Sequence, residues 1–360
     1  MIRLGRHLLL SARQLLTIMH RDNHYVPRSY LKQWASPDLQ VWRYRLLVSH
    51  ARVPLWKLVS TRGVAYHEHL YTKVAASEES DEIERWLDSE FEAPVEQVIE
   101  RAVSERRLNP SDWRLLARFF AAQDVRTPAR LLENVSRWQE SVPEIIQSTL
   151  KESVARLEAM TRSDRALLPK RGSPRNDIPF RVTVTQREGE LDGWIEAETV
   201  AGRGLWLWSI QQILTDSSQA FQALQRHRWT ILRPPAGESW FTSDDPVLKV
   251  NFNSLTDYTF GGGWGSIGTD LMLPLGPEHL LYTQVGRPVP PRGTRMDREK
   301  AAITRRLIAE HAHRYVFANA PDSIVEKLCP RVVDAAELKR EAMEWKRWHA
   351  EQSAAERSLI

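Results

Sequence analysis

The sequence predicts an α+β protein, with a helical N-terminal half whose long amphipathic helices pack on a mixed, largely antiparallel sheet in the C-terminal half. Apolar residues recur at spacings of three and four between residues 77 and 160, which indicates helices. Short apolar runs separated by Gly and Pro fill residues 180–330, which indicates strands. With 42% hydrophobic and 27% charged residues, the 360-residue chain has a globular composition and ample material for a core.

Composition divides the chain into segments. Residues 163–179 are rich in Pro, Gly and Arg, which is typical of a linker or a long loop. The first 21 residues hold four arginines and no acidic residue. We therefore expect a basic extension over 1–21, a mainly helical part over 22–162, a loop or linker over 163–179, an α+β part over 180–330 and a C-terminal helix over 331–360.

The basic extension accounts for the net charge of +4, because four of the 50 basic residues lie in it and 46 remain against 46 acidic residues. Net charge therefore gives no evidence of a basic nucleic-acid-binding domain, although a single groove can still be positive. The longest apolar run of the extension, Leu8–Leu10, is too short for a secretory signal. Met1–Met19 is either a docked or interfacial helix or an addition upstream of a natural start at Met19. No run of 18 apolar residues predicts a membrane span.

The N-terminal half should contain short elements followed by helices, with Pro94 and Pro143 expected to kink or interrupt two of the helices. The expected elements are a helical turn over Ser29–Trp34, strands over Val41–Val48 and His69–Val74, and helices over Ser77–Arg107, from Ser111 or Asp112 to about Val125, and from Pro128 to about Met160.

The C-terminal half should contain strands between Gly and Pro turns, with three helices. The final helix has a stripe of Leu338, Ala342, Trp345 and Trp348, which makes it a candidate surface for packing or for a protein partner. The expected strands are Phe180–Thr185, Trp194–Ala197, Trp229–Leu232, Trp240–Thr242, Val247–Phe252, Leu271–Leu273, Leu280–Val285 and Tyr315–Ala318, and the helices are Leu205–Leu224, Asp297–His313 and Ala335–Arg357.

The most distinctive string is Asn23-His24-Tyr25-Val26-Pro27-Arg28-Ser29-Tyr30-Leu31. Pro27 biases Val26 toward extended geometry, which restricts where His24 and Tyr25 point. An imidazole, two phenols and a guanidinium are thus grouped around a rigid turn. The string is a candidate site with His24 as base or ligand and with Tyr25 and Arg28 as binding residues; a purely structural role is the alternative.

Two further polar groups come from distant parts of the chain. Gln123 and Arg126 share a helix face, and a guanidinium there can grip a carboxylate or phosphate with two parallel bonds. In the turn Ser243-Asp244-Asp245-Pro246, alternation along a strand predicts that Asp244 faces inward and Asp245 outward. Asp244 is a candidate base or metal ligand and Ser243 a candidate binding residue. The alternatives are local capping of the turn and a buried pair between Arg126 and Asp244.

These strings together resemble the opening HYVP-x-x-YL, the Q-x-x-R-T-P and the F-x-S-D-x-P-V motifs of the family described as domain of unknown function 4238. Here they read His24–Leu31, Gln123–Pro128 and Phe241–Val247. Leu273-Pro274-Leu275-Gly276-Pro277 is similar to its P-L-x-P element, with Gly in place of Ser. The resemblance covers about residues 22–320. It implies an uncharacterised, mostly prokaryotic, cytosolic protein and brings no activity with it.

Other patterns are weaker. His67 and His69 would share one face of a strand, but the sequence supplies no third metal ligand, so a surface strand is expected. The spacing from Arg306 to His311 fits a ribonuclease motif and arises easily by chance in an Arg-rich chain. Cys329 is the single cysteine, which excludes an intramolecular disulfide and favours a reducing, cytoplasmic location.

Two functions follow. The first is a metal-dependent hydrolase of a phosphate-containing substrate such as nucleic acid, with His24 and Asp244 as catalytic residues or ligands of Mg²⁺ or Mn²⁺, Arg126 as the phosphate clamp and Tyr25, Arg28, Gln123 and Ser243 as binding residues. The alternative is a non-catalytic binding or interaction module in which the His, Arg and Asp residues form a buried polar network. A shared site requires His24, Arg126 and Asp244 to converge within roughly 10 Å around a concave surface.

Overall fold

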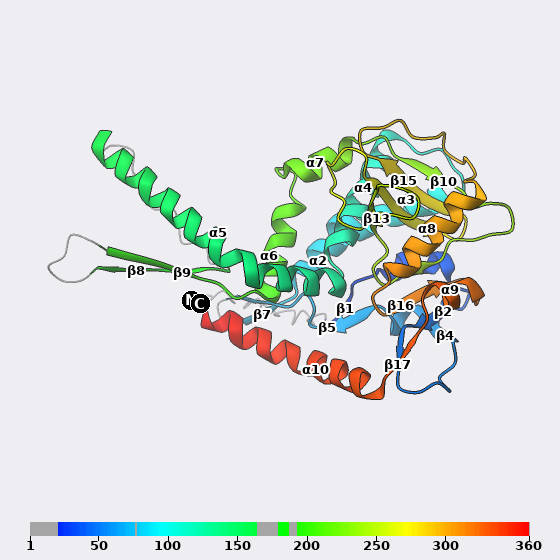
Figure 1. The fold of residues 1–360 in the computed structure, drawn as a ribbon, viewed down its shortest axis with the longest axis horizontal. Helices are drawn as coiled ribbons and strands as arrows, with labels where there is room; N and C mark the ends of the chain where they lie inside the picture. Colours follow the sequence, from blue (N-terminus) through cyan, green and yellow to red (C-terminus); the bar gives the residue numbers. More distant parts are fainter. Residues whose placement is uncertain (1–20, 76–77, 164–178, 187–192, 360) are drawn as a thin grey trace, which may run out of the picture.

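The protein is described by a computed structural model over residues 21–75, 78–163, 179–186 and 193–359. The α+β class is confirmed (Figure 1). The helices are α1 (Arg28–Leu31), α2 (Glu82–Leu87), α3 (Ala93–Val103), α4 (Pro110–Val125), α5 (Pro128–Ser163), α6 (Arg203–Ile213), α7 (Gln219–Arg226), α8 (Arg298–Glu310), α9 (Ser323–Leu328) and α10 (Ala335–Ser358). The strands are β1 (Asp22–His24), β2 (Gln40–Arg45), β3 (Leu47–Val48), β4 (Trp56–Ser60), β5 (Tyr66–Glu68), β6 (Lys73–Ala75), β7 (Glu78–Ser80), β8 (Arg181–Gln186), β9 (Gly193–Glu198), β10 (Thr230–Leu232), β11 (Thr242–Ser243), β12 (Leu248–Phe252), β13 (Tyr258–Thr259), β14 (Asp270–Gly276), β15 (His279–Gln284), β16 (Tyr315–Ala318) and β17 (Val332–Val333).

A five-stranded antiparallel sheet in the order β10-β15-β14-β12-β13 forms the centre of the C-terminal half. Alternate residues of β14 face opposite layers, as side chains along a strand must. Leu271, Leu273 and Leu275 pack in the core shared with α3 and α4, whereas Met272 packs in the core shared with α8. Both faces of this sheet are therefore covered, one by the N-terminal helices and the other in part by α8.

A second sheet joins the two ends of the chain. Its order is β11-β16-β2-β4, and every pair in it is antiparallel. Strands β2 and β4 precede the long helices in sequence, whereas β11 and β16 belong to the C-terminal half. The expected division into a helical half and a sheet-containing half is thus incomplete, because β16 pairs with β2 from Tyr315–Arg45 to Ala318–Trp42.

The N-terminal helices form as local sequence requires. Asn109 caps α4 through the Asp112 amide, and Asp112 accepts from the Asn109 amide in return, both at 2.9 Å. Along α4, Leu116, Phe119 and Phe120 recur on one buried face. These caps and stripes explain why the helix could be placed from sequence within a residue or two.

Several predicted boundaries are wrong, each for a local reason. Pro94 is the second residue of α3, which begins at Ala93 directly after a π-helical turn over Asp88–Glu92, so the helical run changes its hydrogen-bond spacing before the proline and does not end there. Pro143 lies inside α5 without ending it, at an exposed position where water can satisfy the released carbonyl. The single helix expected over Leu205–Leu224 is two helices, because Ser218 caps α7 through the Phe221 amide. The strand expected over His69–Val74 starts only at Lys73, since His69 adopts φ +58° and turns the chain.

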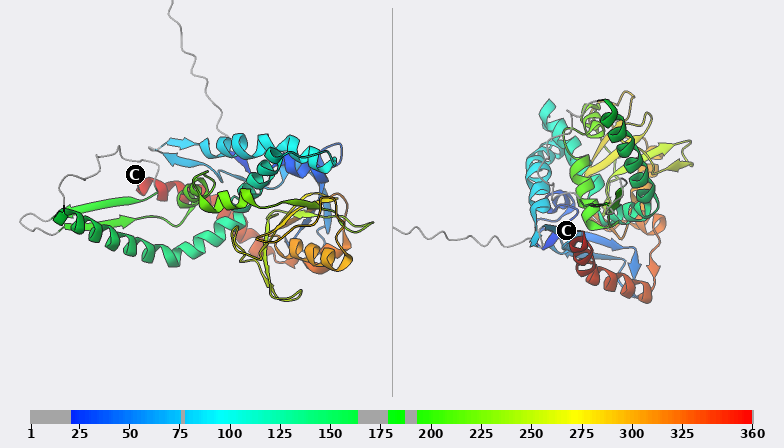
Figure 2. Two further views of the ribbon diagram at one scale, coloured as in Figure 1. Left: turned by 90° about the horizontal axis from the view of Figure 1, so that it is seen from above. Right: turned by 90° about the vertical axis from the view of Figure 1, so that its left-hand side faces the viewer.

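Helix α5 and the hairpin β8–β9 project from the body in the same direction (Figure 2). Helix α10 instead lies along the body beneath β5 and β7 (Figure 1). The helix expected for Met1–Met19 and most of the loop expected over 163–179 lie outside the described residues. Within the described ranges, no helix combines the length and the apolar character needed to cross a membrane.

Candidate functional site

The His24–Leu31 string enters the core directly after β1, which pairs with β5. The Tyr25 amide donates to the Ala65 carbonyl at 3.0 Å, and the Tyr25 side chain is 3% exposed. The half-buried His24 ring donates from Nε2 to the Arg62 carbonyl at 3.2 Å. Burial lowers the pKa of His24, and the positive charges of Arg28 and Arg126 lower it further. Arg28 itself is exposed on α1.

Arg126 ties the second motif to the first. It follows the last residue of α4 and is 1% exposed. Its Nε donates to the Tyr25 carbonyl at 3.0 Å, its Nη2 to the His24 carbonyl at 2.7 Å and its Nη1 to Glu92 Oε1 at 2.5 Å. Gln123 Nε2 donates to the same Tyr25 carbonyl at 2.8 Å. The carboxylate partner of Arg126 is therefore Glu92, and the expected Arg126–Asp244 pair is wrong.

The Ser243–Pro246 turn also faces protein rather than solvent. Asp244 accepts from the backbone amides of His313 at 2.9 Å and Arg314 at 2.8 Å, which holds the loop between α8 and β16. Burial raises the pKa of its carboxyl to about 7, although these amides oppose the rise. Ser243 Oγ accepts from the Asp245 amide at 3.3 Å. The expectation that Asp245 is exposed is wrong, since it is 3% exposed.

Asp245 is buried because it joins a second cluster that the sequence did not reveal. Thr127 Oγ1 donates to Asp245 Oδ1 at 3.0 Å, which links the second motif to the third. His311 Nδ1 donates to the Asp245 carbonyl at 2.9 Å, and Arg130 Nη2 donates to His311 Nε2 at 2.7 Å. These bonds require a neutral His311 with its proton on Nδ1. The signal present in the sequence was the Arg306–His311 spacing, of which only His311 belongs to this cluster.

The three motifs thus meet at one buried junction. His24, Tyr25, Gln123 and Arg126 are joined by hydrogen bonds, and Thr127 connects them to the Asp245 turn. Arg28 does not take part, and the His24 ring points to Arg62 instead of Asp244. A polar network whose donors end on carbonyls and carboxylates stabilises a fold. The catalytic and binding roles of these residues remain predictions.

Two histidines that the sequence assigned to a surface strand instead anchor α10. His67 stacks on Trp345, with ring centroids 4.0 Å apart, and on Tyr25 at 5.6 Å. His69 stacks on His349 at 3.7 Å. Burial lowers the pKa of His67 to about 4, so this ring is neutral near pH 7. The Trp-bearing face of the final helix is therefore packed against its own chain, which leaves its other face for any protein partner.

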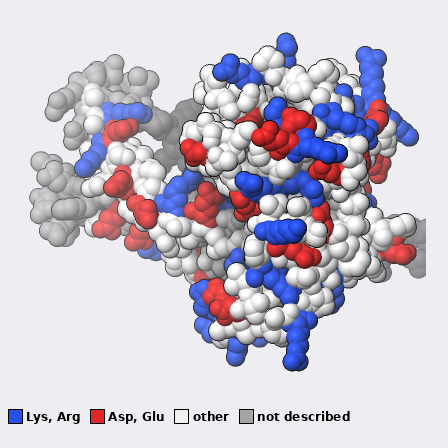
Figure 3. All heavy atoms as spheres, turned by 45° about the vertical axis from the view of Figure 1, so that its right-hand side comes forward, with Lys and Arg blue, Asp and Glu red and all other residues white. Residues whose placement is uncertain are grey.

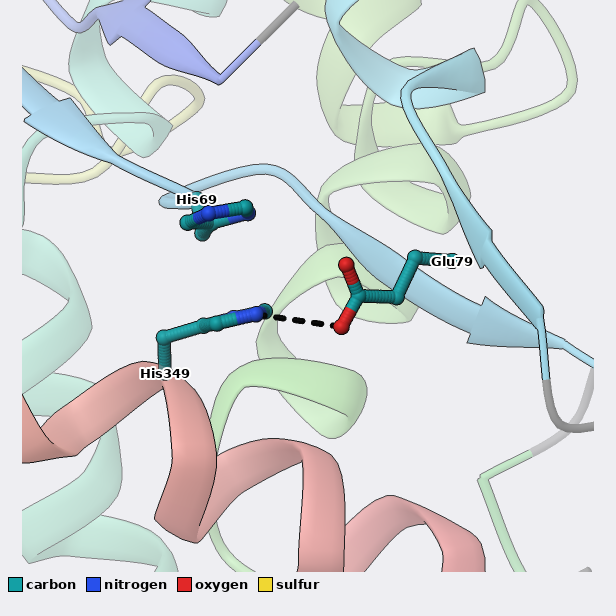
Figure 4. Close-up of side chains that lie close together, drawn as sticks. All are labelled: His69, Glu79 and His349. Atoms are coloured by element: carbon teal, nitrogen blue, oxygen red, sulfur yellow. Dashed lines mark ion pairs between the residues drawn. The ribbon is translucent and has the colours of Figure 1, made fainter. Parts of the chain in front are cut away.

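One group of side chains has the chemistry of metal ligands. It consists of His69, Glu79 and His349, whose ligand atoms all lie within 4.8 Å of one another (Figure 4). Arg203 Nη1 donates to His349 Nδ1 at 2.9 Å. His349 must therefore keep its proton on Nε2, which lies 3.1 Å from Glu79 Oε1. A metal ion at Nε2 would have to displace that proton, and it would lie close to the positive charge of Arg203. These residues are therefore better suited to a hydrogen-bonded link between α10 and β7 than to a metal site. His24 and Asp244 belong to no such group among the described residues.

An open cleft of about 490 Å³ lies between α8 and the face of the five-stranded sheet that α8 covers in part. Its walls are mainly apolar, with Leu232, Phe252 and Met272 from the sheet and Ile303 from α8. We name it the α8 cleft. None of the motif residues lines this cleft, and none lines a second groove beside Trp113 and Trp229.

Polar groups converge on the floor of the α8 cleft. Asp270 on β14 is paired in register with Gln284 on β15, and Tyr282 lies on the same face. Tyr282 donates its hydroxyl to Asp270 Oδ1 at 2.8 Å. Burial raises the pKa of Asp270, and its hydrogen bonds to Tyr282 and Gln284 oppose the rise. Sequence reasoning missed this group because Asp270 belongs to none of the three motifs. It directly precedes Leu271–Leu273, which has the pattern of an ordinary buried strand.

Comparison with known proteins identifies a family. The family model described as "Protein of unknown function (DUF4238)" matches residues 22–322. No curated protein and no solved structure matches the chain.

Proposed function

Because this chain belongs to the family of proteins of unknown function DUF4238, we propose its function from the geometry: it is a non-catalytic binding protein for a small organic ligand, held in the α8 cleft. The family description names no activity, so the proposal depends on the sites themselves. The observation that carries it is the contrast between a buried, mutually bonded motif junction and an open apolar cleft with a few convergent polar groups.

The α8 cleft has the features of a small-molecule site. Its volume of about 490 Å³ lies within the usual range of ligand pockets, and its apolar walls meet a small set of polar groups. Strands β14 and β15, which carry the polar floor, are each paired on both sides, which gives the floor a fixed shape. A rigid and largely preformed pocket binds a ligand without a large cost in ordering.

Binding of the neutral dye Nile red tests this proposal. We expect saturable binding with increased emission, because the dye enters an apolar cleft. Ile303→Trp on α8 fills the cleft and should weaken binding at least tenfold. Ile213→Trp, an exposed position on α6, is the matched control and should bind as the wild type does. Equal binding by Ile303→Trp and the wild type would refute the assignment to this cleft.

A second candidate retains the expectation of a phosphate-bearing ligand, including a nuclease substrate. A groove of about 620 Å³ is lined by Trp113, Arg114, His227, Arg228 and Trp229. Arg114 and Arg228 are exposed, and neither forms an ion pair with a described carboxylate. Guanidinium groups beside aromatic rings suit phosphates and bases.

ATP, inorganic phosphate and single-stranded DNA test this groove, with and without Mg²⁺ or Mn²⁺. Arg114→Gln combined with Arg228→Gln should abolish binding, whereas Arg52→Gln at an exposed site elsewhere should not. Cleavage of the DNA by the wild type and its loss in Asp244→Asn would support a metal-dependent hydrolase over the binding function. On the face in Figure 3, Lys and Arg of the described residues lie among Asp and Glu, so this face carries no extended basic surface.

We infer a cytoplasmic location as well. Cys329 is buried, its thiol donates to the Ala309 carbonyl at 2.7 Å, and burial raises its pKa to about 11. A single unreactive thiol is compatible with a reducing compartment. Cell fractionation with a tagged full-length chain checks this, and recovery outside the cytoplasmic fraction would contradict it.

A further inference from the structure

We propose that the α8 cleft selects an apolar amine, whose ammonium group binds the Asp270 carboxylate while its hydrocarbon part lies against Phe252, Met272 and Ile303. This inference rests on the proposed ligand-binding function and names the chemical class of the ligand. It also makes Asp270 the residue that determines specificity.

Asp270 differs from the other buried aspartates that the structure describes. Four of these have a cationic partner, and the fifth, Asp244, accepts two backbone amides. The four pairs are Asp81–Arg85, Asp112–Arg101, Asp124–Lys249 and Asp245–Arg130. Asp270 is 9% exposed, and no Lys, Arg or His nitrogen of the described residues lies within 4.0 Å of it. A buried carboxylate without a cation is costly, and a cationic ligand removes that cost.

The cations at the rim of the cleft are engaged elsewhere. Lys300 Nζ lies 3.3 Å from Asp297 Oδ2, and Arg295 Nη1 donates to the Pro234 carbonyl at 2.9 Å. The two donors that do reach Asp270 are neutral: the Tyr282 hydroxyl and the Gln284 amide. A carboxylate has about four acceptor positions, so these two donors leave capacity for an ammonium group.

The walls favour a cation with an apolar body. Phe252 and Tyr282 supply aromatic rings, and Met272 and Met296 supply polarisable thioethers. Aromatic faces attract ammonium groups, and methionine adapts to ligands of irregular shape. An anionic ligand bound in the same pose would bring its charge against Asp270, which has no described cation within 4.0 Å, so this end of the cleft should discriminate by charge.

Three ligands with the same ring system separate charge from shape: tryptamine, its neutral alcohol tryptophol and the anion indole-3-acetate. Isothermal titration of the full chain at pH 7.5 should show tryptamine binding at least tenfold more tightly than tryptophol, and no binding of indole-3-acetate. A tenfold ratio corresponds to about 1.4 kcal/mol, close to the lower end of the usual range for a hydrogen bond to a charged group. Equal affinity for tryptamine and tryptophol in the wild type would overturn the proposal without any variant.

Asp270→Asn keeps the side-chain shape and should reduce the preference for tryptamine to less than threefold, with tryptophol binding unchanged. Asp38→Asn, an exposed acid outside the cleft, is the control and should keep the full preference. Tenfold preference retained by Asp270→Asn would overturn the role of Asp270. If none of the three compounds binds the wild type and Nile red does not either, the proposed function fails; if Nile red and tryptophol bind and tryptamine gains nothing, only the charge inference fails.

Discussion

The junction around Arg126 and the α8 cleft both bury ionised side chains, but they satisfy them in different ways. At the junction, the Arg126 guanidinium ends on Glu92 and on the carbonyls of His24 and Tyr25. In the cleft, Asp270 has only neutral donors, and the space before it is open. The junction joins three segments that are far apart in sequence, whereas the cleft lies on one sheet face beside one helix.

The difference shows that the partners of a buried charged side chain indicate whether its role is structural or ligand-binding. A fully paired ion inside a protein fixes which segments meet, and removal of one member leaves the other uncompensated. A buried ion without an opposite charge destabilises the empty protein and favours a ligand that completes it. The distinctive motif residues therefore indicate architecture, while the unremarkable Asp270 indicates binding.

The largest expected effect tests the junction. Arg126→Gln should lower the free energy of unfolding by about 3–5 kcal/mol, because it leaves the Glu92 carboxylate without its cation and the His24 carbonyl without its guanidinium donor, while the Tyr25 carbonyl keeps only Gln123. Urea denaturation at pH 7 measures this. Arg28→Gln, an exposed arginine of the same string, should change it by less than about 0.5 kcal/mol.

The partner of Arg126 can be identified in the same experiment. Glu92→Gln should be strongly destabilising alone, and the double variant should be far less destabilised than the sum of the two single effects. Additive effects would show that the pair in the structure does not hold the junction. An Arg126–Asp244 cycle should instead be nearly additive.

The second largest effect is expected in acid and comes from His67, which stacks on Tyr25 of the junction. The folded pKa of His67 is about 4, below the unfolded value near 6.5, so its contribution to stability is complete above pH 6.5 and is lost as pH falls toward 4. At about 1.4 kcal/mol per unit, up to about 3 kcal/mol disappears over this window. His67→Phe keeps the stacking on Trp345 and should flatten the dependence measured by urea denaturation; His50→Phe at an exposed site should not.

A smaller loss is expected at the acidic turn. Asp244→Asn replaces an oxygen that faces one of the two backbone amides with an NH2 donor, and should cost about 1–3 kcal/mol at pH 5. The folded pKa near 7 exceeds the unfolded value, so the wild type loses stability as pH rises through 7 and the deficit of the variant should shrink by pH 8. A deficit that grows between pH 5 and pH 8 would contradict this assignment.

The smallest effect has the opposite sign and sharpens the contrast between the two regions. Asp270→Asn should raise the stability of the ligand-free protein by about 0.5–1 kcal/mol at pH 7.5, because it removes an uncompensated charge. Since burial raises the pKa of Asp270, the advantage should grow as pH rises from 4. Destabilisation of more than 1 kcal/mol would instead make Asp270 a structural residue.

Local sequence was sufficient for the three motifs and for most of the long helices, but it did not predict β4 or α9, and β7 lies where a helix was expected. The apolar stripes of α4 and α8 act within a few residues, so helix positions follow from spacing. The cap of α4 is Asn109 instead of the expected Ser111 or Asp112, a difference that shifts the start of the helix by only one or two residues. Strand β16 was expected at Tyr315–Ala318, where the structure has it. The errors at Pro143 and between α6 and α7 arose where exposure or a second cap changed a local rule.

The tertiary structure alone decided the partners. Three outcomes depend on contacts between segments at least 34 residues apart: whether Arg126 meets Glu92 or Asp244, whether Asp245 faces inward, and which helix covers His67. The α8 cleft exists because β14 places Leu271 and Leu273 toward α4 and so turns Asp270 and Met272 toward α8. Spacing along the chain specifies which residues share one face of a helix or strand. Which element packs against that face depends on how the whole molecule buries its apolar surface, and spacing does not contain this information.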